Sequence, residues 1–133
     1  MMNNKEKLSH LRNLILLSKA DEIVRPEEEE FIAEVMSREG LTAKEYDYCS
    51  SHVNNIEFAV PEDYGERIEY LYDMIRLMMI DGDIDDRELS ICHDCAVMMT
   101  TPSTDHKRLV SNMIDLVGKE MAKSGIIITH NGN

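Results

Sequence analysis

The amino-acid sequence matches itself when it is shifted by 60 residues, and the match needs no gap. The matched positions are mainly apolar residues at helical spacing, together with two acidic positions. They pair Leu11 with Leu71, Ile15 with Ile75, Leu17 with Leu77, Asp21 with Asp81, Val24 with Ile84, Glu28 with Glu88, Val53 with Met113 and Ile56 with Leu116. Because one such unit cannot bury its apolar face alone, we predict two copies of a helix, acidic turn, helix and helix, each covering the other.

Apolar residues recur every three or four positions along most of the chain, which is the spacing of amphipathic helices. The pattern predicts an all-α, single-domain bundle of about six helices at 4–19, 26–39, 43–56, 62–80, 86–99 and 103–123. The pseudo-repeats span about 4–58 and 64–123, and 126–133 is a short tail. The helix at 62–80 is apolar nearly all round in its last two turns, so we expect it at the centre.

Residues with strong positional preferences mark where these helices begin and end. Pro26 suits the first position of a helix, because its missing N–H would have no partner there. Gly40 suits the end of that helix. Thr42 opens the third helix in a capping box with the glutamate three residues on. Ser103 or Thr104 is expected to cap the sixth helix.

The balance of charge limits the kinds of partner. Lysine and arginine number 14 against 26 aspartate and glutamate residues, which gives a net charge of −12. An acidic surface repels phosphate backbones, so we expect no binding of nucleic acid, whereas cations and basic protein patches remain candidates. No run approaches the roughly 18 apolar residues of a membrane span, and no signal peptide is recognisable. These features predict a cytoplasmic protein.

Two of the three cysteines form a C-x-x-C pattern that could indicate zinc or redox chemistry. A structural zinc site needs four ligands, and Cys49 is isolated from the pair Cys92 and Cys95. In the 60-residue register the pair occupies the places of Ile32 and Val35. We therefore expect both thiols to behave as small buried apolar groups.

Five carboxylates lie within the eight residues Asp81–Glu88, between two predicted helices. Asp85 followed by Glu88 fits a capping box, which contributes about 1 kcal/mol to a helix. Asp81 is less simply explained, because the C-terminal end of a helix disfavours negative charge. An Asx-turn, in which its carboxylate accepts an N–H two residues on, is a sufficient structural reason.

The alternative is that the acidic turns bind a divalent cation or a basic partner. Asp81, Asp83 and Asp85 match the first three ligand positions of a calcium-binding EF-hand loop, and oxygen ligands suit Ca²⁺ or Mg²⁺. The match then ends, because Asp86 stands at the glycine position and Cys92 at the glutamate position. The candidate metal ligands are Asp81, Asp83, Asp85, Glu88, Asp21 and Glu28.

The stretch Ile80–Glu88 resembles the signature A-D-G-x-[IV]-x-x-x-E of the TerB-like, tellurite-resistance family. Ala20–Glu28 resembles a degenerate first copy, with Glu22 in place of the glycine. The resemblance implies one small bacterial helical domain over 1–133, associated with tellurite or general stress resistance or used beside other domains. It also implies that metal or partner binding involves Asp21, Glu28, Asp81 and Glu88.

Signals for catalysis are weak. The five histidines are scattered singly, at His10, His52, His93, His106 and His130, and no G-x-S-x-G, Walker or H-E-x-x-H motif occurs. We therefore predict a non-enzymatic interaction or stress-response module whose partner the sequence does not identify.

Two alternatives stay open beside this prediction. One is a homodimeric helical scaffold whose acidic turns are purely structural and whose methionines line a groove, although their spacing is more typical of a core. Those methionines are Met74, Met78, Met79, Met98 and Met99. The other is a carboxylate-bridged metalloenzyme, which is disfavoured because di-metal bundles use E-x-x-H pairs and none is present.

Overall fold

The computed structural model describes residues 4–20, 22 and 25–123, and within these ranges the chain is all-helical with no β-strand. The helices are α1 (Asn4–Ser18), α2 (Pro26–Glu39), α3 (Ala43–Ser51), α4 (Tyr64–Met78), α5 (Asp86–Met99) and α6 (His106–Lys123). They form a single-domain helical bundle, which confirms the fold class predicted from the sequence. None of these described helices is long and apolar enough to cross a membrane.

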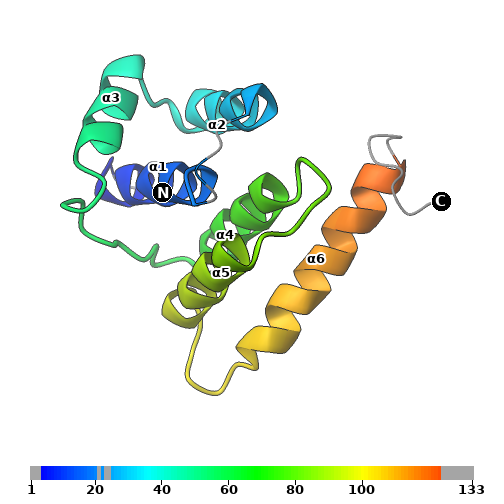
Figure 1. Ribbon diagram of the computed structural model, residues 1–133. Helices are drawn as coiled ribbons and strands as arrows, with labels where there is room; N and C mark the ends of the chain where they lie inside the picture. The colour runs from blue at the N-terminus through cyan, green and yellow to red at the C-terminus, as the bar shows by residue number, and fades with distance from the viewer. Residues whose placement is uncertain (1–3, 21, 23–24, 124–133) are drawn as a thin grey trace.

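The six described helices fall into two groups, α1–α3 and α4–α6 (Figure 1), which share some contacts and differ in one: α5 packs on α6, whereas α2 does not pack on α3. The bounds of α1 and α4, and those of α2 and α5, are offset by 60 residues. α1 packs on α2 and α3, as α4 packs on α5 and α6. The two groups meet where α1 lies against α4, with further contacts of α1 with α5 and of α4 with α2. α1 and α4 are therefore the central pair.

One described residue after α1 and its counterpart after α4, 60 positions later, both have a positive φ. Gly82 has a φ of 86° and Glu22 a φ of 66°, both in the left-handed region. The Gly82 N–H donates to the carbonyl of Met79 at 3.1 Å, as the Glu22 N–H donates to that of Lys19 at 3.0 Å. Glycine adopts this conformation without steric cost, whereas a side chain there costs about 1 kcal/mol. The glycine of the second turn therefore has a local structural reason.

One continuous apolar core runs through both groups of helices. Its central members are fully buried at matching places of α1 and α4, namely Leu11, Leu14, Ile15, Leu17, Leu71, Met74, Ile75 and Leu77. Cys92 and Cys95 belong to this core, as predicted from the places of Ile32 and Val35. Burial raises the pKa of Cys95 to about 12 and raises that of Cys92 as well, so both thiols are neutral.

The third helix is shorter than predicted, because it ends at Ser51 instead of residue 56. The N–H of His52 donates to the carbonyl of Tyr48 and closes the last turn of α3. The carbonyl of His52 then accepts the N–H of Asn55 at 2.8 Å, which turns the chain. Asn54 and Asn55 are poor helix formers, and this local preference outweighs the apolar spacing that suggested a longer helix.

The fourth and sixth helices begin later than predicted, because aspartates cap them. Asp63 accepts the N–H of Glu66 at 3.0 Å, so α4 begins at Tyr64. Asp105 accepts the N–H of Arg108 at 3.1 Å, so α6 begins at His106. The predicted caps of the sixth helix were wrong: Ser103 and Thr104 lie in the preceding turn, where the Thr104 N–H donates to Thr101. An aspartate cap binds these free N–H groups with a full negative charge at the positive end of the helix.

Candidate functional site

Asp81, the least explained residue of the acidic turn, is held by two interactions within the chain. Its Oδ1 accepts the N–H of Asp83 at 3.1 Å, which is the Asx-turn that the sequence allowed. Its Oδ2 lies 3.0 Å from Nη1 of Arg25, the residue just before α2. The second acidic turn is thereby tied to the segment that follows the first one.

Asp85 caps α5, as predicted, but through a different N–H. Its Oδ1 accepts the N–H of Arg87 at 2.8 Å, whereas the predicted capping box placed the bond on Glu88. Hydrogen bonds from Arg87 hold the pKa of Asp85 below its usual range. The side chain of Glu88 is buried, with 3% exposed, as is that of Glu28 with 2%. The two glutamates therefore belong to the interior at matching places of α5 and α2.

The candidate metal ligands do not converge on one point in the described part of the chain. Asp81 and Asp85 are bound by Arg25 and Arg87, and Asp83 is exposed. Within residues 4–20, 22 and 25–123, no three His, Cys, Asp or Glu side chains are arranged to hold a metal ion. Asp21 lies outside the described residues. A cation site at the acidic turns thus rests on the sequence pattern alone.

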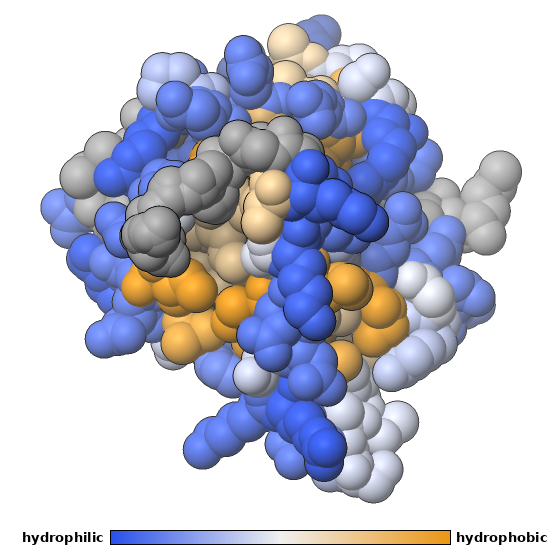
Figure 2. All heavy atoms as spheres, turned by 90° about the vertical axis from the view of Figure 1, so that its right-hand side faces the viewer, coloured by the Kyte–Doolittle hydropathy of each residue, from blue (hydrophilic) through white to orange (hydrophobic). Residues whose placement is uncertain are grey.

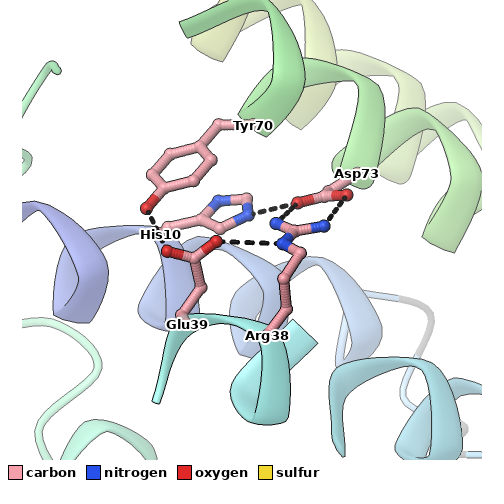
Figure 3. Close-up of polar contacts among 5 residues, drawn as sticks. All are labelled: His10, Arg38, Glu39, Tyr70 and Asp73. Carbon is pink, nitrogen blue, oxygen red and sulfur yellow. Dashed lines mark hydrogen bonds and ion pairs between the residues drawn. The ribbon is translucent and has the colours of Figure 1, made fainter. Parts of the chain in front are cut away.

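A polar network joins α1, α2 and α4, and it is buried at His10, Tyr70 and Asp73 and reaches the surface at Arg38 (Figure 3). Asp73 of α4 is 2% exposed and binds two partners. Its Oδ2 lies 2.8 Å from Nε2 of His10 and 2.6 Å from Nη2 of Arg38. The other guanidinium nitrogen, Nη1 of Arg38, donates to Oδ1 of Asp73 at 3.2 Å. The carboxylate therefore receives a two-pronged guanidinium contact and an imidazole contact at once.

Glu39 and Tyr70 extend the network. Nε of Arg38 donates to Oε2 of Glu39 at 2.9 Å, and the Tyr70 hydroxyl donates to Oε1 of Glu39 at 3.3 Å. The Tyr70 ring stacks on the His10 ring, with centroids 3.6 Å apart and planes 6° from parallel. The five side chains, His10 included, thus form a closed ring of contacts.

The charges of the network compensate one another. Burial alone would raise the pKa of Asp73, but the hydrogen bonds from His10 and Arg38 outweigh it and hold the pKa below its usual range. Hydrogen bonding to Asp73 raises the pKa of Arg38, and burial raises that of Tyr70. Because ionised Asp73 can only accept, His10 donates through Nε2. His10 Nδ1 is buried and has no hydrogen-bond partner in the described part of the chain.

This network is closed to substrates. His10 and Tyr70 are each 1% exposed and Asp73 is 2% exposed, so no ligand reaches the imidazole in this conformation. Its members come from both groups of helices, and removing one partner of such a buried pair costs roughly 3–5 kcal/mol. The network therefore fixes how the two groups pack.

The sequence reasoning missed this network, although a signal was present. In the 60-residue register His10 aligns with Tyr70, and Asn13 aligns with Asp73. The apolar stripes of α1 and α4 are thus interrupted by polar residues at the same two positions of the 60-residue register. Because α1 packs against α4, His10 stacks on Tyr70 and reaches Asp73.

An apolar groove of about 250 Å³ lies between α2, α4 and α6. Four apolar side chains and two charged ones line it, namely Phe31, Ile80, Val117, Met121, Glu27 and Arg76. Figure 2, which faces the side of the molecule where α6 lies, shows apolar surface on both sides of a polar ridge. This groove is one hollowed apolar surface of the described chain from which a binding function can be argued.

The two charges of the groove have no ion-pair partner within the described part of the chain. Neither Glu27 nor Arg76 forms an ion pair or a side-chain hydrogen bond with another described residue. The guanidinium of Arg76 lies over the ring of Phe31, 5.2 Å from its centroid, and a cation–π contact of this kind does not use the N–H donors in hydrogen bonds. The groove therefore offers one basic and one acidic contact beside its apolar floor.

The methionines that the sequence suggested as groove residues lie elsewhere. Met74, Met78 and Met99 are buried in the interior, Met79 is half-buried against the core, and Met98 is exposed. The methionine of the groove is Met121 of α6. Periodicity identified these side chains as apolar but not the place where three helices leave a surface uncovered.

Comparisons with protein-family models, with curated proteins and with solved structures find no match for this chain.

Proposed function

We propose that the chain is a non-enzymatic interaction module that binds a helical segment of a partner protein in the groove between α2, α4 and α6. The observation that carries the proposal is the groove itself, an apolar floor beside an acidic and a basic side chain that have no ion-pair partner among the described residues. Membership of the TerB-like family, a bacterial origin, a cytoplasmic location and a role in stress resistance belong to the same proposal.

The described side chains that could perform nucleophilic or acid–base chemistry support a binding role over a catalytic one. Cys49, Cys92 and Cys95 are buried, and burial raises the pKa of each thiol. His10 is enclosed by its network. The groove contains a carboxylate and a guanidinium, without a nucleophile and base in contact among its described residues.

The size and walls of the groove suit anchor side chains of a protein segment. Its volume of about 250 Å³ is below the ~300–1,000 Å³ of typical small-molecule pockets. Grooves between helices receive amphipathic helices whose apolar residues recur at i, i+3, i+4 and i+7. A segment of that kind would bury Ile80 and Met121, which are half-buried in the free chain.

A synthetic helical peptide with a leucine stripe tests the proposal. Calorimetric titration should give a dissociation constant in the micromolar range, which corresponds to a binding free energy of about −8 kcal/mol. Ile80→Asp places a charge on the groove floor and should abolish binding. Val97→Asp, a change at an exposed apolar residue outside the groove, is the matched control and should leave binding intact. Equal binding by both variants would contradict the proposal.

A further inference from the structure

The helix α2, which supplies Glu27 and Phe31 to the groove, carries a stripe of glutamates. Glu27 lines the groove, and Glu30 and Glu34 follow it at the i+3 and i+7 positions of α2. Residues at this spacing share one face of a helix, and all three side chains are exposed. Like charges at these distances repel one another, so the stripe is better satisfied when a cationic partner lies along it.

The opposite charge comes from a different helix. Arg76 belongs to α4 and is held over the Phe31 ring, so its position in the groove is defined before any partner arrives. Among the described residues it has no carboxylate partner. The groove thus has an acidic edge along α2 and a single basic point on α4.

From this distribution of charge we propose the chemistry of the partner, an inference that rests on the proposed function. The partner is an amphipathic helix with an apolar stripe for the groove floor, a basic flank that lies along Glu27, Glu30 and Glu34, and an acidic residue that pairs with Arg76. Reversing the helix end to end would place its basic flank against Arg76. The charges therefore select one direction of binding as well as one class of partner.

Three synthetic peptides of about 18 residues, or five helical turns, separate the charge inference from the groove itself. All three share one leucine stripe and differ in the residues on its two flanks. One peptide has lysine on one flank and glutamate on the other (Lys/Glu), one has lysine on both (Lys/Lys), and one has glutamate on both (Glu/Glu). We expect the Lys/Glu peptide to bind most tightly. The Glu/Glu peptide should bind about tenfold more weakly, which is what a few exposed ion pairs together provide.

The complementary change is made in the protein. Glu27→Gln/Glu30→Gln/Glu34→Gln should weaken binding of the Lys/Glu peptide about tenfold and reduce its dependence on salt. Glu62→Gln/Glu69→Gln/Asp94→Asn changes the net charge equally at exposed residues that do not line the groove, and should have no such effect. Arg76→Gln should reduce the preference for Lys/Glu over Lys/Lys.

The outcomes are distinguishable. Equal affinities for the three peptides would overturn the charge inference while leaving groove binding in place. No binding by any peptide would overturn both proposals. If the peptide binds only after Ile126→Ser/Ile127→Ser/Ile128→Ser, the occupant of the groove is the chain's own tail. If light scattering shows a dimer that Ile80→Asp dissociates, the occupant is a second copy of the chain. Either result would overturn the assignment of a partner helix.

Discussion

Two regions of this molecule depart from the usual placement of polar and apolar side chains, and they do so in opposite directions. The network around Asp73 places charges in the interior, whereas the groove beside Phe31 leaves apolar side chains at the surface. In the network, His10 and Arg38 both bind the Asp73 carboxylate. In the groove, neither charge has an ion-pair partner among the described residues.

The difference shows which region acts on the fold and which acts on a partner. A buried charge is tolerated when its chain supplies the opposite charge and the hydrogen bonds, so the network contributes to stability and to specific packing. A half-exposed apolar surface whose charges have no ion-pair partner among the described residues gains free energy when a binding partner covers it. Substitutions in the network should therefore change unfolding, and substitutions in the groove should change binding.

The largest effect is expected from Asp73→Asn. The change removes the charge that Arg38 and His10 share, and it should lower the free energy of unfolding by about 3 kcal/mol. Urea unfolding followed by circular dichroism measures this loss. Asp94→Asn, at an exposed residue of α5, is the control and should change stability by less than about 0.5 kcal/mol. If the two variants lower the free energy of unfolding by similar amounts, the network does not determine how the helices pack.

The pH dependence of stability provides a second measurement on the same carboxylate. The pKa of Asp73 is lower in the folded chain than the ordinary value of 3.8. Its ionised form therefore stabilises the fold above about pH 4, and this contribution is lost as the pH falls through the folded pKa. Urea unfolding at a series of pH values below about 5 should show this loss in the parent chain and a shallower one in Asp73→Asn.

A smaller effect is expected where a polar group enters the interior without partners. Cys92→Ser places a hydroxyl at a fully buried site beside Met78 and should cost about 2 kcal/mol, more than Cys92→Ala. The parent thiol should also resist alkylation until the chain unfolds, because burial raises its pKa. Rapid alkylation of Cys92 in the native protein would show that this part of the core is open.

A substitution in the groove should affect binding more than stability, which is the opposite of what we expect in the network. Ile80→Asp should lower the free energy of unfolding by only about 1 kcal/mol, because Ile80 is half-buried, while peptide binding is lost. Asp73→Asn, measured under conditions where it is folded, should bind the peptide as the parent does. A loss of binding that tracks stability in both variants would mean that the two regions are not separate.

The smallest effect is expected at the acidic turn. Asp81→Asn keeps an oxygen for the Asp83 N–H and removes the charge opposite Arg25, so it should cost less than about 1 kcal/mol and less still at high salt. Thermal unfolding with and without Ca²⁺ checks whether the carboxylate has a further role. A stabilisation by Ca²⁺ that Asp81→Asn abolishes would show that the turn binds cations.

Local signals in the sequence were sufficient to predict the described helices, although not all of their ends. The capping box at Thr42 forms as predicted, with the Thr42 N–H donating to Glu45 at 2.8 Å. The C-terminal glycine of α2, Gly40, has a left-handed φ of 72°. Each of these features depends on residues within one turn of each other, which is the range over which a sequence pattern is informative.

The two functional regions depend on contacts that no local pattern contains. His10, Arg38 and Asp73 come from three helices and meet only when α1, α2 and α4 pack. From the sequence, Glu27 is predicted to be a charge that favours the start of a helix. Its place beside a groove follows from the packing of α6. The shared register of α1 and α4 was the only sequence signal that pointed to the meeting of the polar side chains.

The most direct test of a binding role is a nuclear magnetic resonance titration of the isotope-labelled chain with the Lys/Glu peptide. The groove predicts that the largest chemical-shift changes occur at Phe31, Ile80, Val117 and Met121, with changes along the α2 glutamates and with His10 and Asp73 unaffected. Changes confined to Asp81–Glu88, or none at saturating peptide, would contradict the groove as the site of recognition.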